Sequence, residues 1–306
     1  MDLRYPVKEG RVLHLNNINY KIDKVIGYGG SCIAYSSQRE PSKYERSIGM
    51  PPIPSIIKEF YPAELANSIT REKNNLIVLS DKQETYDSLR KNFEQGAVKQ
   101  ALFFIEDSDH SFAPSRIAAA NNTVYSVVEA VNGHLLSEIR EELNAHEISQ
   151  VLLSLCYAVK GLHQNDKLHL DIKPSNIFLF NKGSFETCRI ALFDFDTVTP
   201  VNEIETAFIP FSEDWCPSEQ IVPHRKQISF ATDIYAIGAV AYWLLSGEKV
   251  NKELLDSIIR ERFDFLNEFE VLRGMKNAKE DISKLLYCTL KRNPTKRAQK
   301  IDDFNE

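Results

Sequence analysis

The sequence predicts an α+β fold in which most strands precede most helices. In the first part of the chain, apolar residues occur in short alternating or continuous runs, which is the pattern of strands. After residue 133 they recur with helical spacing. The predicted strands are two within 20–38 and one each in 55–60 and 123–131; the main predicted helices are 81–104, 134–142, 146–163 and 233–247. With 306 residues and 43% hydrophobic content, the chain can bury one large core or two small ones.

A cluster of glycines separates the first two predicted strands. Gly27, Gly29 and Gly30 predict a strand, a glycine loop and a second strand within 20–38. Because glycine has no Cβ, such a loop lets backbone N–H groups approach phosphate oxygens closely. Taken alone, glycines between strands are more often an ordinary hairpin turn, so the rest of the chain has to decide between the two interpretations.

The next predicted strand carries a single lysine in an apolar context. Residues 39–54 are polar and rich in proline, which predicts a long loop, and Lys58 then lies within the strand 55–60. An isolated lysine near a strand end usually extends to solvent. The following segment, 81–104, has the spacing of an amphipathic helix.

A polar octapeptide, 169–176, lies between a predicted helix and a short apolar strand, 177–180. It places Asp171, Lys173 and Asn176 close together, and proline between them stiffens the backbone. Such a loop can present a carboxylate, a cation and an amide to one point in space. Phosphoryl transfer uses that set, as a base for the hydroxyl proton, a charge for the phosphate and an oxygen ligand for Mg2+.

From about Tyr20 to about Ala298, these motifs and their order resemble those of protein kinases, in particular bacterial eukaryotic-like Ser/Thr kinases. The octapeptide is similar to the catalytic loop H-R-D-x-K-x-x-N, with Leu170 where arginine is usual. Asp194, in an Asp-Phe-Asp sequence after an apolar strand, is similar to the aspartate of D-F-G. The segment 212–219 is similar to T-x-x-Y-x-x-P-E.

The resemblance implies an ATP-dependent enzyme that phosphorylates serine or threonine hydroxyls of a protein substrate. Asp171 would accept the hydroxyl proton, Lys173 would hold the γ-phosphate, and Ser212 would hydrogen-bond both side chains. Asn176 and Asp194 would hold Mg2+, with Mn2+ as an alternative. Self-phosphorylation is also expected. Its candidate sites are Thr197, Thr199, Thr206 and Ser212.

The resemblance also implies a nucleotide site in the first part of the chain. The glycine loop would cover the phosphates, and Cys32 stands where the family pattern has a third glycine. Ala34 would lie above the adenine ring, and Lys58 would hold the α- and β-phosphates. The full set implied for ATP is Gly27, Gly29, Gly30, Ala34, Lys58, Glu94, Glu129 and Val131, with Asn176 and Asp194 acting through the metal.

The helix 81–104 should supply a glutamate that pairs with the strand lysine, and its identity is open. The family pattern F-x-x-E-A puts Gly96 in that place, whereas a shift of two residues puts Glu94 there. The residue four positions later should be apolar because it packs beneath the helix. Val98 meets this condition for Glu94, and Gln100 does not for Gly96, so we predict Glu94. The alternative is that Glu94 is an ordinary solvated charge.

The fold implied is the two-lobed protein-kinase-like fold. Residues 1–132 would form an N-lobe of a small antiparallel sheet plus a helix, and 133–306 a mainly helical C-lobe; together they would make one catalytic domain with ATP between them. Within the second lobe, Asp233 would anchor the catalytic loop, and Glu219 would pair with Arg297.

Two residues depart from the family pattern. Leu170 replaces the arginine that normally binds a phosphate on the activation segment, so we predict activity without phosphorylation of that segment. Asp196 replaces the glycine of D-F-G, and because residues other than glycine resist positive φ, we predict a restricted swing of this segment.

The main alternative function is a nucleotide-binding pseudokinase that acts as a scaffold or regulatory module. The uncertain lysine partner and Asp196 favour it. Against it, the chain retains the groups of which pseudokinases commonly lose at least one: Lys58, Asp171, Lys173, Asn176 and Asp194. A small-molecule phosphotransferase comes third, because that class lacks Lys173 and the 212–219 segment.

Composition and charge limit the other classes. The net charge of −6 gives no support to nucleic-acid or anionic-membrane binding. No apolar run approaches a membrane span and no signal peptide is recognisable, so we expect a cytoplasmic protein without membrane contact in this chain. Five cysteines without CxxC spacing predict reduced thiols. The sequence stops soon after Arg297, as a piece of a longer protein would.

Overall fold

The computed structural model describes residues 2–106, 116–129, 133–180, 189–207, 209, 211–221, 225–273 and 276–304. The chain folds as two compact units, Met1–Asn132 and Gly133–Glu306. The boundary expected from the sequence lies at the same place. Each unit is described by itself below.

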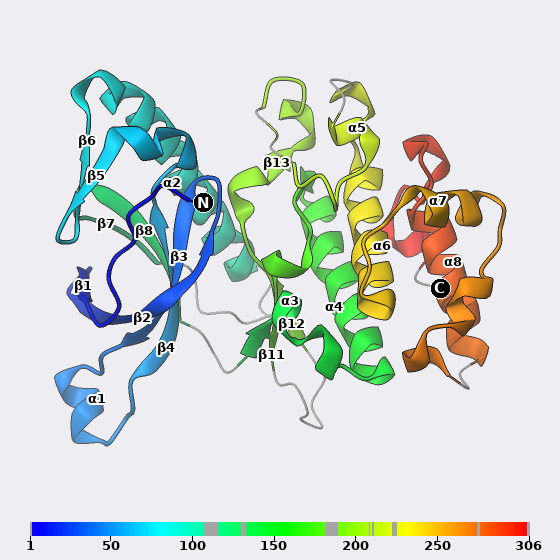
Figure 1. The fold of residues 1–306 in the computed structure, drawn as a ribbon, viewed down its shortest axis with the longest axis horizontal. Helices are drawn as coiled ribbons and strands as arrows, with labels where there is room; N and C mark the ends of the chain where they lie inside the picture. The colour runs from blue at the N-terminus through cyan, green and yellow to red at the C-terminus, as the bar shows by residue number, and fades with distance from the viewer. Residues whose placement is uncertain are drawn as a thin grey trace. The chain divides into compact units, whose positions relative to one another are not determined.

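An antiparallel six-stranded sheet forms most of the first unit (Figure 1), with strand order β1-β2-β3-β4-β8-β7. A separate hairpin, β5–β6, follows β4. The strands are β1 Val12–Leu15, β2 Ile18–Tyr28, β3 Cys32–Arg39, β4 Ile53–Phe60, β5 Ile69–Glu72, β6 Asn75–Val78, β7 Arg116–Ala120 and β8 Thr123–Glu129.

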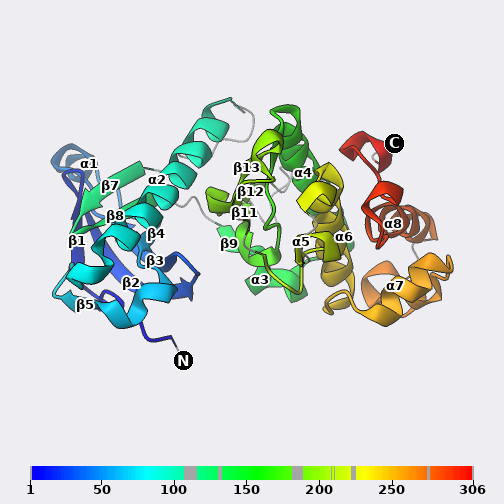
Figure 2. The ribbon, with the colours of Figure 1, turned by 90° about the horizontal axis from the view of Figure 1, so that it is seen from above.

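Both faces of this sheet are packed around β4, where Ile57 and Glu59 are buried on one face and Phe60 on the other. On one face, Phe60 packs against Tyr86 and Phe93 of α2 (Gln83–Glu106), with ring centroids 5.1 and 5.5 Å apart. On the other face, Tyr35 and Ile57 are fully buried. In Figure 2 the long helix α2 runs along the sheet.

The polar segment expected to be a long loop contains a short helix, α1 (Lys43–Ser47). Ser42 and Glu45 form a capping box, because the Glu45 carboxylate accepts from the Ser42 N–H at 2.7 Å and the Ser42 hydroxyl accepts from the Glu45 N–H at 3.2 Å. Arg39 adds an ion pair to Glu45 at 2.7 Å. The Ser-x-x-Glu spacing that signals this cap is readable in the sequence, so the loop prediction was wrong here for a local reason.

Helices dominate the second unit, and the central pair, α4 and α6, lie side by side (Figure 1). The helix α6 is buried nearly all round, as its apolar sequence predicts. A Cβ at Gly238 would lie 2.2 Å from the Thr289 hydroxyl, so α6 and α8 approach closely only because this residue is glycine. The helices are α3 Leu136–Ile139, α4 Ala145–Gln164, α5 Ser218–Ile221, α6 Phe230–Ser246, α7 Lys252–Ile259 and α8 Lys276–Thr289.

Short strands in the second unit hold the octapeptide 169–176 at both ends. Strand β10 (Lys167–Leu168) pairs with β13 (Thr199–Pro200), and β11 (Ile177–Phe180) pairs with both β12 (Arg189–Leu192) and β9 (Gly133–Leu135). The helix predicted over 134–142 is therefore partly wrong, because β9 precedes the short α3 and a 3-10 turn (Arg140–Glu142).

The described part of the chain contains no helix with both the length and the apolar character needed to cross a bilayer. Its four cysteines, Cys32, Cys156, Cys216 and Cys288, are all free thiols. The expectation of reduced cysteines stays a prediction.

Candidate active site

The octapeptide 169–176 joins β10 to β11, and Asp233 of α6 holds its first residues. The Asp233 carboxylate accepts from the His169 N–H at 2.8 Å and from the Leu170 N–H at 2.9 Å. Leu170 has a φ of 64°, a conformation that costs a residue other than glycine about 1–3 kcal/mol. The two hydrogen bonds fix this strained backbone, which confirms the anchoring role expected for Asp233.

The fully buried Asp233 stays ionised because it is well hydrogen-bonded. Burial acts to raise the pKa of Asp233, but a hydrogen bond from His163 Nε2 at 3.0 Å and the loop amides outweigh it and lower the pKa below its ordinary value. An ionised carboxylate can accept from all three donors at once. Asp233 therefore serves as a fixed negative anchor under the loop.

His169 connects the loop to the residue that follows β12. Its Nε2 donates to the Phe193 carbonyl at 3.0 Å, and its Nδ1 accepts from the Asp171 N–H at 3.3 Å. Burial lowers the pKa of His169, which keeps the ring neutral. A neutral ring with the proton on Nε2 fits both partners.

Asp171, Lys173, Asn176 and Ser212 form one hydrogen-bonded group. The Asp171 Oδ1 atom accepts from the Ser212 hydroxyl at 2.7 Å. Its Oδ2 accepts from Lys173 Nζ at 2.8 Å and from Asn176 Nδ2 at 3.0 Å. Lys173 Nζ also donates to Ser212 Oγ at 2.8 Å. The structure thus places an oriented carboxylate, a cation, an amide and a hydroxyl together, as the sequence predicts.

Asn176 and Asp194 lie at the ends of two paired strands, β11 and β12. The Phe193 N–H donates to the Asn176 carbonyl at 2.8 Å, which brings the two ends together. Asn176 Nδ2 donates to the Asp171 carbonyl at 2.9 Å as well as to its carboxylate, so the amide orientation is fixed. The side-chain oxygen of Asn176 is then the atom that would ligate a metal, together with the Asp194 carboxylate.

The unusual backbone of the Asp-Phe-Asp segment belongs to Asp194. Its φ is 65°, in the left-handed region, whereas Asp196 lies in the 3-10 turn Phe195–Thr197 and is not among the described residues with positive φ. In this conformation, the replacement of glycine by Asp196 therefore carries no positive-φ cost. The restricted swing of the segment stays a prediction about other conformations.

The pairing expected between Glu219 and Arg297 is confirmed. Both side chains are buried, and Arg297 Nη1 and Nη2 bind the two carboxylate oxygens of Glu219, the second at 3.1 Å. Arg297 also donates to the carbonyls of Ala231 and Arg292 at 3.2 and 3.0 Å. This bidentate pair ties the segment after Ser212 to the end of the chain.

Leu170 lies in an apolar cluster at the position where the family pattern has arginine. The buried members of this cluster are Leu168, Leu170, Ile204 and Ile228, and Ile209 and Phe230 pack against them. Ile204 and Ile209 belong to the segment after Asp194. The Leu170 side chain therefore binds that segment through apolar contact.

In the first unit, the expected nucleotide-binding residues form a row across the sheet. Lys58 of β4 lies opposite Ala34 of β3, and Ala34 lies opposite Gly27 of β2. Residues opposite one another in an antiparallel pair share a face, so the three project to the same side of the sheet. By the alternation along β4, this is also the face of Phe60 and α2.

Open space lies beside two glycines of the loop. A Cβ added at Gly27 or Gly30 would meet no protein atom within 4 Å, and one at Gly29 would make only ordinary contact with Cys32. A hydrogen bond from the Gly29 N–H to the Cys32 carbonyl at 2.9 Å closes the turn. Packing within the protein does not require glycine at Gly27 or Gly30, and the backbone there is accessible from outside the protein.

Val98 does not pack beneath α2, so the reason for which Glu94 was predicted is wrong. Val98 is 45% exposed, whereas Phe93 and Gly96 are buried on the inner face of α2. Glu94 is 40% exposed, and its carboxylate lies 3.6 Å from Arg90 Nε on the same helix. A one-residue error in helical phase moves a side chain by about 100° and explains the failure. The pairing of Glu94 with Lys58 stays a prediction.

Two further predicted residues mark the end of the first unit. Glu129 is the last residue of β8, where its backbone lies opposite Ser55. Val131 lies outside the described residues. Their expected backbone contacts with adenine stay predictions.

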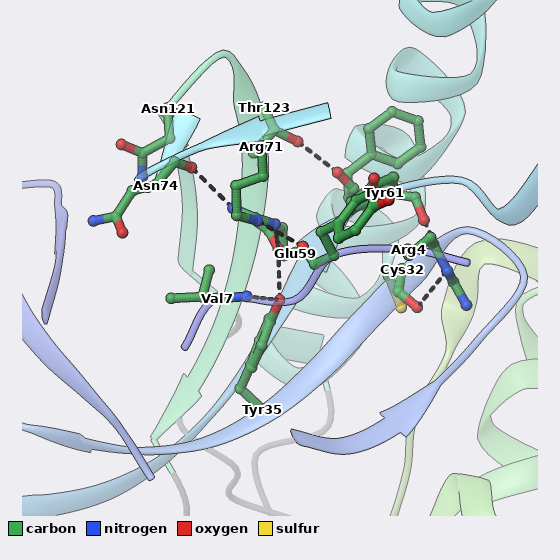
Figure 3. Close-up of polar contacts among 12 residues, drawn as sticks. Arg4, Val7, Cys32, Tyr35, Glu59, Tyr61, Arg71, Asn74, Asn121 and Thr123 are labelled. Carbon is green, nitrogen blue, oxygen red and sulfur yellow. Dashed lines mark hydrogen bonds and ion pairs between the residues drawn. The ribbon is translucent and has the colours of Figure 1, made fainter. Parts of the chain in front are cut away.

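Sequence reasoning missed a buried polar group on the opposite face of β4 (Figure 3). The Glu59 carboxylate accepts from the hydroxyls of Tyr35 and Tyr125 at 2.7 and 2.9 Å and from Arg71 Nη2 at 2.5 Å. Burial raises the pKa of both tyrosines, so they remain donors. Since neighbouring residues of a strand face opposite sides, Glu59 lies on the face opposite Lys58 and fixes β4 through its hydrogen bonds there. The available signal was a carboxylate next to Lys58 in a strand whose other residues are mostly apolar.

Comparison with known proteins gives consistent results. A model of the protein kinase domain matches residues 108–303. Human myosin light chain kinase family member 4 is 31% identical over 200 residues, which cover 62% of this chain and 50% of that protein. The probable serine/threonine-protein kinase PknB of Corynebacterium glutamicum is 26% identical over 240 residues, 75% of this chain and 31% of that protein. The chain thus spans about half or less of these relatives.

A solved structure, the apo form of PpkA-294, has a TM-score of 0.65 over 98% of both chains at 22% sequence identity, which shows a shared fold. The two units accordingly represent the N-lobe and C-lobe of the protein-kinase-like fold. Because the kinase-domain model matches more than half of the sequence, the chain belongs to the protein kinase family.

Proposed function

We propose that this chain is a Ser/Thr protein kinase that transfers the γ-phosphate of ATP to a protein hydroxyl. The observation that carries the proposal is the hydrogen-bonded group of Asp171, Lys173, Asn176 and Ser212. It combines a base, a cation and an amide oxygen ligand in fixed orientation, which phosphoryl transfer requires. The relatives named as serine/threonine and myosin light chain kinases support a protein acceptor.

In the proposed reaction, Asp171 accepts the proton of the acceptor hydroxyl. The hydroxyl oxygen forms a bond to the γ-phosphorus while the bond from that phosphorus to the bridging oxygen breaks, so ADP is the leaving group. Hydrogen bonds from Ser212 and Lys173 hold the Asp171 carboxylate in one orientation. Lys173 is also close enough to the base to neutralise charge on the phosphate that is being transferred.

The residues at the proposed metal site fit Mg2+. Asn176 and Asp194 supply one amide oxygen and one carboxylate, and Mg2+ usually takes few protein ligands and completes its shell with phosphates and water. Bound there, Mg2+ would neutralise the charge of the nucleotide phosphates. The fixed Asn176 amide and the ordered Phe193 backbone would keep both oxygens in place.

The row of Gly27, Ala34 and Lys58 supports ATP as the nucleotide in the first unit. A lysine beside an open glycine loop provides charge and accessible backbone for phosphates, and Ala34 provides a small apolar surface for adenine.

Activity independent of activation-segment phosphorylation belongs to the same proposal. The Leu170 cluster holds Ile204 by burial, so the segment is fixed without an ion pair at this position. A phosphate near Leu170 would find no cation from this side chain and would lose hydration.

The test is turnover of ATP with Mg2+ in the presence and absence of a generic protein acceptor. Asp171→Ala and Lys58→Met should each reduce phosphate transfer by about 100-fold or more, because each removes a group that acts on the reacting atoms. Lys21→Met and Asp281→Ala, which change exposed residues of the same types, are the matched controls and should retain activity.

Other outcomes decide between classes. ATP binding without turnover by the wild-type chain would favour the pseudokinase alternative. Turnover that occurs only with small-molecule acceptors would favour a small-molecule phosphotransferase. Equal activity of wild type and Asp171→Ala would overturn the proposed mechanism.

A further inference from the structure

An arginine that belongs to none of the kinase motifs, Arg4, is buried beside the glycine loop. Its side chain is 2% exposed. Arg4 Nη1 donates to the carbonyl oxygens of Cys32 at 3.1 Å and Tyr61 at 2.7 Å. Cys32 begins β3 directly after the loop, and Tyr61 directly follows β4. Arg4, Cys32 and Tyr61 lie close together in Figure 3. Arg4 Nη1 therefore links the glycine loop to the end of β4, the strand that contains Lys58.

The guanidinium of Arg4 has a fixed orientation. Asp2 accepts from Nε at 2.9 Å and from Nη2 at 2.6 Å, and it also accepts from the Arg4 backbone N–H at 2.9 Å. The hydrogen bond from Arg4 lowers the pKa of Asp2 to about 2, so the pair is ionised at neutral pH. The guanidinium also lies over the ring of Tyr28, 5.4 Å from its centroid. Tyr28 ends β2 and lies between Gly27 and Gly29, so Arg4 contacts both sides of the loop.

Backbone hydrogen bonds continue the same connection. The Ser31 carbonyl accepts from the Tyr61 N–H at 3.0 Å, and the Gly30 carbonyl accepts from the Ala63 N–H at 2.8 Å. The glycine loop is thus attached to residues 61–63, the segment that Arg4 also binds. Tyr61 is three residues beyond Lys58, so these contacts relate the loop to the lysine.

The contacts of Arg4 with Cys32 and Tyr61, called the Arg4 clamp below, restrict the conformation of the glycine loop. Glycine residues are conformationally free, so a loop that contains them stays ordered only through contacts from outside. Charge-assisted hydrogen bonds to buried carbonyls are stronger than neutral ones. Loss of Arg4 removes the donor to the Tyr61 carbonyl and leaves the Cys32 carbonyl with the Gly29 N–H. A loop that is already ordered before the ligand arrives loses less entropy on binding.

We propose that Arg4 is a positioning residue for the nucleotide site, which holds the glycine loop in register with the strand of Lys58. This assignment rests on the ATP site proposed above. A residue that only supported the fold would change stability when replaced, whereas a positioning residue would also change the Michaelis constant for ATP.

The chain offers a matched control in Arg39, at the other end of β3. Arg39 is also buried, and it makes a two-pronged ion pair with Glu45 at 3.0 and 2.7 Å. Arg39→Gln removes the same chemical group at the end of β3 that lies away from the loop. It should lower the melting temperature and leave the Michaelis constant for ATP unchanged.

The experiment compares the wild-type chain with Arg4→Gln, Arg4→Lys and Arg39→Gln. For Arg4→Gln we expect a rise of about tenfold in the Michaelis constant for ATP, with kcat changed less than about threefold. Arg4→Lys should restore part of the affinity, because one ammonium nitrogen can donate to both carbonyls although it lacks the fork that Asp2 orients. Asp2→Asn should change the constant in the same direction as Arg4→Gln, and it serves if Arg4→Gln does not fold.

Hydrogen exchange of the loop amides, 27–33, provides a readout that does not need ATP. Exchange should be faster in Arg4→Gln than in the wild type and in Arg39→Gln. A Michaelis constant that rises equally in Arg4→Gln and Arg39→Gln, or that does not rise in Arg4→Gln, would overturn the assignment. If the wild-type chain bound no ATP, the proposed function would be overturned. Hydrogen exchange would still test the Arg4 clamp in that case, and an unchanged exchange rate in Arg4→Gln would overturn it.

Discussion

At the scale of single residues, the orientation of Asp171 depends on one hydroxyl from a distant segment. Ser212 donates to the Asp171 carboxylate and accepts from Lys173, so it contacts both groups proposed to act on the reacting atoms. Without it, the donors that remain to the carboxylate among the described residues are Lys173 and Asn176 of the loop itself. Ser212 thereby couples the position of its own segment to the state of the base.

Replacement of Ser212 tests this coupling. Ser212→Ala should lower kcat by roughly 10- to 100-fold, because a carboxylate with a wider range of orientations is less often aligned with the acceptor hydroxyl. Ser212→Thr keeps the hydroxyl and should retain most activity. Steady-state kinetics with a protein acceptor measure both. If the Ser212→Ala variant had the kcat of the wild type, Lys173 and Asn176 would suffice to orient the Asp171 carboxylate.

Predictability from sequence differs sharply between residues of the site. Asp171, Lys173 and Asn176 are only a few positions apart, so a short loop necessarily brings them together, and the structure does so. Glu94 required knowledge of the phase of α2, which a sequence with apolar residues on more than one side does not determine. The partners of Glu59 come from three other segments, and no spacing rule connects them.

At the scale of elements, one buried ion pair joins α5 to the segment after α8. Glu219 lies at the start of α5, and Arg297 follows the 3-10 turn Pro294–Lys296. Removal of one partner leaves a buried charge without its counterion, which is far more costly than the loss of an exposed pair. The structure also contains an exposed pair for comparison, Lys249 and Asp214.

Arg297→Met should reduce the free energy of unfolding by about 3–5 kcal/mol, because the Glu219 carboxylate stays buried and unpaired. The double variant Arg297→Met with Glu219→Leu should be less destabilised than the single variant, since no charge remains. Lys249→Met should cost less than about 1 kcal/mol, as expected for a surface pair. Denaturant unfolding provides the three values. A single variant no worse than Lys249→Met would mean that water reaches Glu219.

Long elements were predictable for a simple physical reason, and short ones were not. The helix α6 is apolar on all sides and buried on nearly all, so its hydropathy alone identifies it. In contrast, α1, α3 and β9 comprise only 5, 4 and 3 residues, too few to establish a period. Their conformation depends on caps and on strand partners elsewhere in the chain, such as β11 for β9.

At the scale of the whole molecule, the proposed chemistry is divided between the two units. The first contains the glycine loop, Ala34 and Lys58, and the second contains Asp171 and the other groups proposed for transfer. The kinase-domain match begins at residue 108, so it includes the second unit and only the end of the first. The nucleotide-binding role proposed for the first unit is therefore supported by the sheet register and the open glycine loop.

The position of the segment after Asp194 depends on apolar contacts within the second unit. Ile204 and Ile209 pack in the Leu170 cluster, and Ser212 beyond them reaches the base. Apolar packing of this kind does not need a phosphate as a partner. We therefore expect that a fully dephosphorylated preparation is already active.

Treatment with a nonspecific phosphatase, checked by intact-mass measurement, should leave kcat within about twofold of the untreated enzyme. Leu170→Arg tests the physical reason, since a guanidinium placed in the buried cluster lacks a counterion unless the segment carries a phosphate. That variant should be less stable and less active after phosphatase treatment than before it, whereas Leu170→Met should behave like the wild type. Loss of wild-type activity on dephosphorylation would show that apolar contact at Leu170 does not suffice to hold the segment, and that phosphate contacts elsewhere in the second unit are required.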